Sequence, residues 1–224
     1  MAVASTIPAP ELVSTRDAIL DAAERRFAER GFDGVSVREI AADVGLKNQA
    51  SLYYHFASKQ EIYEAALKRG VDALIARLAE SAEAAPRARD AAMVARDLDR
   101  VLDYLVDHPH LARLIQRAGL DESAFVRGTV RRIVEPLYTQ GVRALRDAGG
   151  PWQDADLPHV AAGIYHLIFG YFADAPLLEA VLGEDLHSAA ALARQRRFLK
   201  MAVAQLLGVD RTSEVTKHEG GDLP

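Results

Sequence analysis

Hydrophobic residues recur at spacings of three, four and seven along most of this chain, which is the repeat of an α-helix. Leu67, Leu74 and Leu78 form one such stripe, and Leu98 and Leu105 belong to another. Glycine, proline and capping residues interrupt the stripes, and no segment alternates with the two-residue repeat of a β-strand. The pattern therefore predicts an all-α fold with about nine helices.

The later helices are separated by clear helix-ending signals. They are expected to span residues 58–83, 90–107, 110–118, 121–148, 157–173 and 188–207. Pro136 lies inside the fourth of these and predicts a kink or a break, because proline has no amide hydrogen to donate. Residues 208–224 are polar and carry no apolar repeat, so we expect a disordered tail.

The segment 36–56 carries the most informative pattern in the chain. Ser36 followed by Glu39 is a capping box, which predicts that a helix begins at about Val37. Gly45 stands where that helix must end and can adopt the left-handed backbone conformation without strain. A second short helix follows, so the segment predicts a helix-turn-helix.

The second helix of this pair carries a polar and aromatic outward surface. Leu52 and Phe56, four residues apart, face the core, which leaves outside the side chains of Asn48, Gln49, Ser51, Tyr54 and His55, with Tyr53 at the margin. Asn and Gln can read adenine, whereas Tyr, His and Lys commonly bind phosphates. The alternative is an amphipathic helical hairpin whose tyrosines are half-buried. A second capping box, Ser58 with Glu61, predicts a helix N-terminus that directs Lys59 at the DNA backbone.

Together with residues 15–32 and 58–63, this segment resembles the N-terminal domain of TetR-family transcriptional regulators, over roughly residues 14–68. The resemblance implies an all-helical homodimer with a three-helix DNA-binding domain and a larger core that binds a ligand and dimerises. In such proteins the effector usually spreads the two DNA-reading helices and releases the operator.

The resemblance also implies roles for individual residues. The candidates for contact with base edges are Arg38, Asn48, Gln49 and Ser51, and those for phosphates or sugars are Thr15, Ser36, Tyr53, Tyr54, His55 and Lys59. Six residues separate Gly45 from the Leu52–Tyr53 pair, where the commoner family pattern has five. Assignments within residues 47–50 are therefore open by one position.

Charge limits how such a protein can bind DNA. The chain has a formal net charge of −5, and nine Lys and Arg stand against ten Asp and Glu between Glu11 and Gly70. Diffuse attraction to phosphates is therefore weak, and we expect binding to depend on specific contacts. The partner is expected to be double-stranded DNA with a pseudo-palindromic operator.

Two later segments predict a homodimer. Residues 157–173 are apolar nearly all round and need cover on every side. The last helix carries an apolar stripe that would complete a four-helix seam between subunits, namely Leu192, Leu199, Val203 and Leu206. The alternative is a core buried within one subunit.

An apolar effector pocket is expected between helices of the core. Its candidate residues are Met93, Tyr104, Leu105, Arg113, Gln116, Phe125, Tyr138, Tyr165, His166 and Phe169, although plain core packing explains any one of them as well. His159 and His166 share a helical face, but no paired carboxylates accompany them, so we expect no metal site.

Composition and missing motifs narrow the function classes. Cysteine is absent, no apolar run reaches membrane-span length, and the first ten residues do not read as a signal peptide, so we expect a cytoplasmic protein. No phosphate-binding loop, nucleophile elbow or zinc-helix motif is present, so we expect neither an enzyme nor a cofactor.

We therefore predict a ligand-responsive, sequence-specific regulator, most simply a repressor released by a small, largely apolar effector. The alternative is a helical lipid- or partner-binding module without specific DNA binding. The expected parts are an N-terminal arm (1–13), a DNA-binding domain (14–60), an effector-binding and dimerisation domain (61–207) and the tail (208–224). The operator, the regulated genes, the effector and the sign of regulation do not follow from the sequence.

Overall fold

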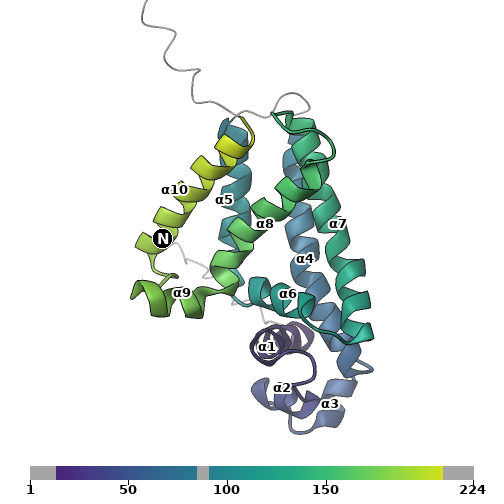
Figure 1. Ribbon diagram of the computed structural model, residues 1–224. Helices are drawn as coiled ribbons and strands as arrows, with labels where there is room; N and C mark the ends of the chain where they lie inside the picture. Colours follow the sequence, from purple (N-terminus) through teal and green to yellow (C-terminus); the bar gives the residue numbers. More distant parts are fainter. Residues whose placement is uncertain (1–13, 85–90, 209–224) are drawn as a thin grey trace, which may run out of the picture.

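The computed structural model describes residues 14–84 and 91–208 (Figure 1). In these ranges it contains ten helices and no strand. The expected arm, the tail beyond Gly208 and Pro86 lie outside the described residues. The helices are α1 (Thr15–Arg30), α2 (Val37–Asp43), α3 (Gln49–Tyr53), α4 (Lys59–Ala84), α5 (Ala91–Asp107), α6 (Leu111–Gly119), α7 (Ala124–Ala148), α8 (Leu157–Ala173), α9 (Ala175–Leu182) and α10 (Ala189–Leu206).

The first three helices form a small unit at one end of the molecule, here called the head (residues 14–58) (Figure 1). Its core is made of side chains with almost no exposed surface, including Ile19, Phe27, Ile40, Leu52 and Phe56. Apolar burial of this kind is the main force that holds such short helices in place. Leu52 and Phe56 face inward as expected.

The larger unit is a bundle of longer helices, here called the core (residues 59–208). α4 begins beside α3 and runs the length of the bundle, where it packs against α5 and α7 (Figure 1). α6 crosses beneath the bundle and packs against α1, so it joins the core to the head. Displacements of the core helices therefore reach the head through α4 and α6.

Two features of the core differ from the sequence expectation. α7 is one helix that continues through Pro136, so of the expected kink or break, the break does not occur. A tenth helix, α9, occupies a stretch where none was expected. Pro176 signals the end of α8, but it occupies the first turn of α9, where proline is well tolerated because that amide needs no partner within the helix.

α8 and α9 are the most apolar pair of consecutive helices. Within the described ranges no single helix meets the length and hydropathy expected of a membrane span. By length and composition alone this pair does so together, although it bends by 72° at the junction.

Candidate nucleic-acid interface

The geometry of α2 and the turn after it follows from local hydrogen bonds. The Ser36 hydroxyl accepts from the Glu39 amide, and the Glu39 carboxylate accepts from the Ser36 amide at 2.8 Å, so the expected capping box is present. Gly45 has φ +69°, in the left-handed region that glycine adopts at least cost. The Leu46 amide then donates to the Ala41 carbonyl at 3.0 Å, which closes the end of the helix.

The helix that would read DNA is shorter than the sequence suggests and has its own cap. α3 contains only five residues, and Asn48 is its N-cap. The Asn48 side-chain carbonyl accepts from the Ser51 amide at 3.0 Å and from the Ser51 hydroxyl at 3.1 Å. Two of the four candidates for base contacts therefore also bond to each other, and the Asn48 NH₂ remains as the donor facing outward.

The outward surface of α3 and its flanks is exposed. Tyr54 has 95% of its surface accessible and Tyr53 has 45%. Gln49 donates to the Tyr53 hydroxyl at 2.9 Å, and both are exposed. The remaining candidates Thr15, Ser36, Arg38 and His55 are exposed as well, and Ser51 is half-buried. This surface lies at the free end of the head (Figure 1).

Ion pairs within the head fix α1 against α2. Arg25 and Arg26 both bond to Asp43, at 2.8 Å and 2.6 Å, and Arg30 bonds to Glu39 at 2.8 Å. The hydrogen bonds from Arg26 hold the pKa of Asp43 at about 2, below its ordinary value of 3.8. Hydrogen bonds from Ser36, then Arg30, hold the pKa of Glu39 at about 2 as well. Sequence reasoning missed these contacts.

The same ion pairs decide which cations can meet phosphates. Five of the nine Lys and Arg side chains in residues 14–70 are paired with acidic groups, namely Arg25, Arg26, Arg30, Lys68 and Arg69. For the other four, no ion pair is present within the described residues; they are Arg16, Arg38, Lys47 and Lys59. Arg16 at the start of α1 lies over the ring of Phe56, so the exposed positive charge nearest α3 comes from Arg38 on α2 and from Lys47.

The N-terminus of α4 differs in detail from the expected capping box. The Ser58 hydroxyl accepts from the Glu61 amide at 3.1 Å, but the Glu61 carboxylate accepts from the amide of Ala57, one residue before the cap. The Lys59 ammonium lies over the ring of Phe32, 4.4 Å from its centre. Lys59 is therefore half-buried against the head, whereas we expected it to point at the DNA backbone.

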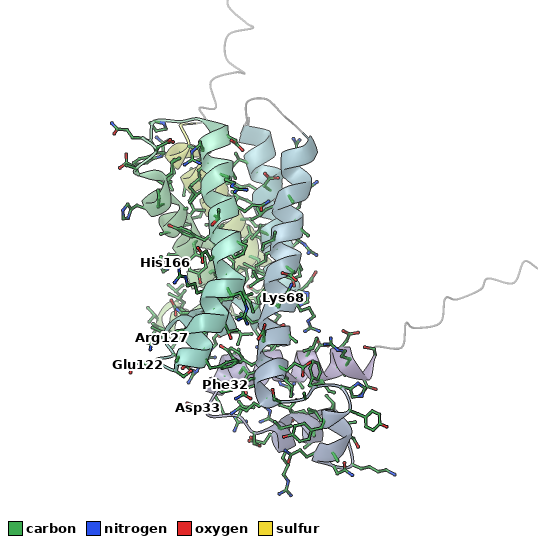
Figure 2. All side chains as sticks on the ribbon, turned by 90° about the vertical axis from the view of Figure 1, so that its right-hand side faces the viewer. Phe32, Asp33, Lys68, Glu122, Arg127 and His166 are labelled. Carbon is green, nitrogen blue, oxygen red and sulfur yellow. The ribbon has the colours of Figure 1, made fainter. Side chains whose placement is uncertain are left out.

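An aromatic cluster joins the head to the core. The Phe32 ring lies 5.2 Å from that of Tyr63 on α4 and 5.1 Å from that of Phe125 on α7. Phe32 lies where the head meets the upright helices of the core (Figure 2). Phe125, expected in the effector pocket, is thus part of this junction.

The core contains an apolar cavity of about 540 Å³, open to the surface, between α4, α5, α7, α8 and α10. Three of the residues proposed from the sequence line this cavity, namely Tyr138, Tyr165 and Phe169. The Tyr165 and Phe169 rings stack at 4.6 Å, and burial raises the pKa of the Tyr165 hydroxyl. Trp152 lies beside one end, because its indole donates to the carbonyl of Leu206 and the next residue, Leu207, lines the cavity.

Several residues expected in the effector pocket lie elsewhere. Leu105 is fully buried, and Tyr104 packs between Arg77 at 4.1 Å and His108 at 4.2 Å. Arg113 and Gln116 line a second, more polar cavity of about 560 Å³ between head and core, where Gln116 donates to Asp174 at 3.0 Å. Three- and four-residue spacing shows that a position is at least half-buried, as each of these is. It does not distinguish residues that line the apolar cavity from residues that pack elsewhere. The side chain of Met93 lies outside the described residues.

The surface expected to pair two subunits also needs correction. Leu199 and Val203 on α10 are buried within the chain, so they cannot form the expected seam. Phe198 and Met201 are instead 50% and 60% exposed. On α8 one face is buried, while the opposite one exposes His159, Gly163 and His166, which excludes His166 from the cavity lining.

These observations define a class of protein: an all-helical chain with an N-terminal helix-turn-helix and a larger helical unit that contains an apolar cavity. The sequence model of the family described as "Bacterial regulatory proteins, tetR family" matches residues 19–66. These residues are thus similar to the TetR-family N-terminal domain, and the whole described chain has the all-helical fold of TetR-type regulators.

The sequence relatives match the same region. The chain is 49% identical over 53 residues to the "Biofilm operon icaADBC HTH-type negative transcriptional regulator IcaR" of Staphylococcus aureus (strain Newman), which is 24% of this chain. The matched region spans 28% of that relative, so the chain covers under a third of its length. The same regulator from Staphylococcus epidermidis is 46% identical over 48 residues, 21% of this chain and 25% of its own.

Solved structures extend the likeness of fold to the core. The ketosteroid transcriptional regulator KstR2 of Mycobacterium tuberculosis superimposes with a TM-score of 0.64 at 21% identity, over 89% of this chain and 96% of KstR2. A TetR-like transcriptional regulator from Rhodococcus sp. RHA1 gives 0.62 at 20% identity, over 91% and 100%. At such low identity these structures establish the fold alone.

Proposed function

We propose that this chain is a ligand-responsive, sequence-specific DNA-binding transcriptional regulator, and in its simplest form a repressor. Residues 14–60 would bind the operator, and residues 61–207 would bind the effector and a second subunit. The family to which the head belongs is regulatory, which supports a role other than catalysis. We also infer that the protein acts in the cytoplasm.

The exposed surface of α3 carries this proposal. Tyr54 is almost fully exposed although it is a large aromatic residue, and His55, Gln49 and the Asn48 NH₂ lie exposed in the same short segment. Arg38 and Lys47, exposed and without an ion pair among the described residues, lie on α2 and just before α3. Such a surface suits the major groove, where amides read base edges and cations hold phosphates.

A repressor released by a small apolar effector fits the core. The 540 Å³ cavity lies within the size range of small-molecule sites, and its walls are mostly aliphatic and aromatic. The sequence relative IcaR is named a negative transcriptional regulator, which supports repression as the sign of regulation. α7 contributes both Val130 and Val134 to the cavity wall and Phe125 to the aromatic cluster, so a ligand that moves α7 would shift the head.

A homodimer would cover the exposed apolar surface of the core. Phe198 and Met201 on α10, and the outer face of α8 around Gly163, are uncovered in the single chain. Two copies would also place two heads on a two-fold operator. We propose this face, rather than the buried stripe of α10, as the subunit interface.

The first test is fluorescence anisotropy of labelled DNA from upstream of the protein's own gene, with unrelated duplex as the control, over a salt series. We expect saturable binding that prefers the upstream DNA and persists at physiological salt. Tyr54→Ala with His55→Ala should weaken this binding by about tenfold or more, since each lost hydrogen bond to a charged phosphate costs about 1.5–3 kcal/mol. Gln153→Ala, exposed in the loop before α8 at the opposite end of the molecule, should leave it unchanged.

Other outcomes would change the assignment. Equal and salt-sensitive binding to both duplexes would contradict specific recognition of that DNA. No binding at low salt would favour the helical lipid- or partner-binding module. Unchanged affinity in the double variant would show that α3 does not read the operator.

A further inference from the structure

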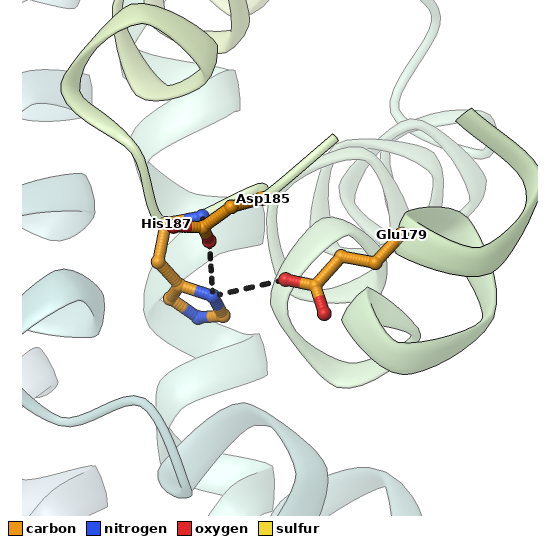
Figure 3. Close-up of side chains that lie close together, drawn as sticks. All are labelled: Glu179, Asp185 and His187. Carbon is orange, nitrogen blue, oxygen red and sulfur yellow. Dashed lines mark hydrogen bonds and ion pairs between the residues drawn. The ribbon is translucent and has the colours of Figure 1, made fainter. Parts of the chain in front are cut away.

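Three side chains with metal-binding atoms meet at the corner between α9 and α10. They are Glu179 from α9 and Asp185 and His187 from the loop that follows it (Figure 3). The Nδ1 atom of His187 lies 3.4 Å from Oε1 of Glu179 and 3.9 Å from Oδ1 of Asp185. One potential ligand atom from each residue lies within 4.8 Å of the other two. Figure 3 shows both carboxylates directed at the same imidazole nitrogen.

Backbone hydrogen bonds hold both carboxylates in this arrangement. Glu179 Oε1 accepts from the Leu186 amide at 3.2 Å, and Asp185 Oδ1 accepts from the His187 amide at 2.8 Å. Leu186 is itself buried, and its carbonyl accepts from the Tyr171 hydroxyl at 2.9 Å. The loop is therefore fixed by contacts independent of the imidazole. In metal sites, ligating carboxylates are commonly oriented by hydrogen bonds of this kind.

The two distances to the imidazole nitrogen are close to those of a tetrahedral metal centre. With metal–ligand bonds of about 2.1 Å and tetrahedral angles, neighbouring ligand atoms lie about 3.4 Å apart. The Glu179–His187 distance already has this value, and the Asp185–His187 distance needs to close by a few tenths of an ångström. One imidazole nitrogen and two carboxylate oxygens would leave the fourth position for water or another ligand.

The donor set selects the kind of metal. Ca²⁺ and Mg²⁺ take oxygen ligands at six or more positions, whereas imidazole with carboxylates suits first-row transition metals. We propose that Glu179, Asp185 and His187 bind a divalent transition metal ion, with Zn²⁺ as the reference ion. The site lies outside the head and outside the lining of the apolar cavity, so it does not depend on the proposed regulatory function.

Bound metal would tie the last turns of α9 to the start of α10. α9 exposes Leu177, Val181 and Leu182, and α10 exposes Phe198. The ion would therefore fix the relative position of two helices whose apolar side chains are uncovered in the single chain. A charged imidazole paired with the two carboxylates would make the same contacts without metal, so the experiment must separate these two cases.

The test is titration of the full-length, chelator-treated protein with ZnCl₂ at neutral pH, followed by calorimetry and by thermal unfolding. We expect one site that raises the unfolding temperature. His187→Gln and Glu179→Gln should weaken it at least tenfold, because even an outer-shell partner costs about 10–100-fold. His159→Gln, an exposed histidine on α8, is the matched control and should bind as the wild type does.

The chain has seven histidines, His187 included, and a variant can lose metal binding because it misfolds. A second readout separates these cases from loss of the proposed site. Co²⁺ in place of Zn²⁺ should give the visible absorption of a tetrahedral site in the wild type and lose it in His187→Gln. Helix content by circular dichroism should be the same in all variants. Absence of binding by the wild type, or equal binding by His187→Gln, would overturn the proposal.

Discussion

At the residue scale, the head depends on two carboxylates that are ionised more easily than usual. Asp43 receives hydrogen bonds from Arg25 and Arg26, and Glu39 receives them from Ser36 and Arg30. Both have a pKa of about 2 in the folded protein. Because their pKa is lower folded than unfolded, the stabilisation is complete above about pH 4.5 and is lost as the pH falls towards 2.

Asp43→Asn should therefore lower the free energy of unfolding at pH 7 by about 1–2 kcal/mol, because one charged acceptor of two arginines is lost. Urea unfolding at pH 7, 5 and 3 would measure this. The difference between wild type and variant should shrink towards the lowest pH. Asp33→Asn, exposed and without an ion pair in the described part of the chain, is the control and should change little. A difference independent of pH would contradict the assigned role of Asp43.

Some of these residues could be predicted from sequence and others could not. The capping box of Ser36 and Glu39 and the left-handed Gly45 follow from local spacing alone, and both are present. Asp43 stands 17 positions from Arg26, and nothing in the sequence pattern fixes how α1 crosses α2. Contacts of this kind depend on the angle between helices, which hydrophobic periodicity does not specify.

At the element scale, α4 and α6 are in contact at a glycine. A methyl group added at Gly70 on α4 would lie 2.4 Å from Cδ1 of Leu111, which is fully buried at the start of α6. Glycine is thus needed here for close approach, and its backbone freedom is not used. Since α6 also packs against α1, this contact helps to place the head.

Gly70→Ala should destabilise the protein by about 1–3 kcal/mol through overpacking. Gly128→Ala in α7 is the matched control, because a methyl group there meets nothing within 4 Å. Alanine at an open helical position should instead stabilise by up to about 1 kcal/mol. Chemical unfolding of both variants would show opposite signs. Stabilisation by both substitutions would mean that Leu111 moves aside without cost and would contradict the role given to Gly70.

The positions of the helices along the chain were predicted more reliably than the neighbours against which each helix face packs. The ends of α8 follow directly from its apolar run, whereas the short helix α9, which begins two residues after it, was not predicted. On α10 the apolar stripe was recognised, but Leu199 faces the core of its own chain and Phe198 faces outward. A stripe shows that a helix has an apolar side, but it does not show which neighbour covers that side.

At the scale of the whole molecule, the apolar cavity and the DNA-reading surface lie at separate places in one framework. α4 contributes Leu74 and Leu78 to the cavity wall and Tyr63 to the aromatic cluster beneath it. An occupant of the cavity can therefore act on the head only by displacing core helices that contact it, such as α4. A substitution that fills the cavity should abolish the release of DNA by an effector but leave DNA binding itself intact.

Ala161→Leu, on the cavity wall, tests this separation. The larger side chain should weaken binding of the hydrophobic dye 8-anilinonaphthalene sulfonate to the folded protein by about tenfold, since it occupies the space that an apolar ligand needs. DNA affinity should remain within about twofold of the wild type. Ala190→Leu, exposed near the start of α10, is the control for added apolar surface. Loss of DNA binding together with dye binding would contradict the separation.

The position of Trp152 has a practical consequence. It is the only tryptophan in the 224 residues, and its indole is bonded to the carbonyl of Leu206, next to a residue that lines the cavity. The emission wavelength of an indole depends on the polarity of its surroundings and on its hydrogen bonding. Movement of this end of α10 therefore shifts the wavelength of the protein's own ultraviolet fluorescence. The chain thus contains a single built-in optical reporter beside its cavity, and candidate effectors can be screened without attaching any dye.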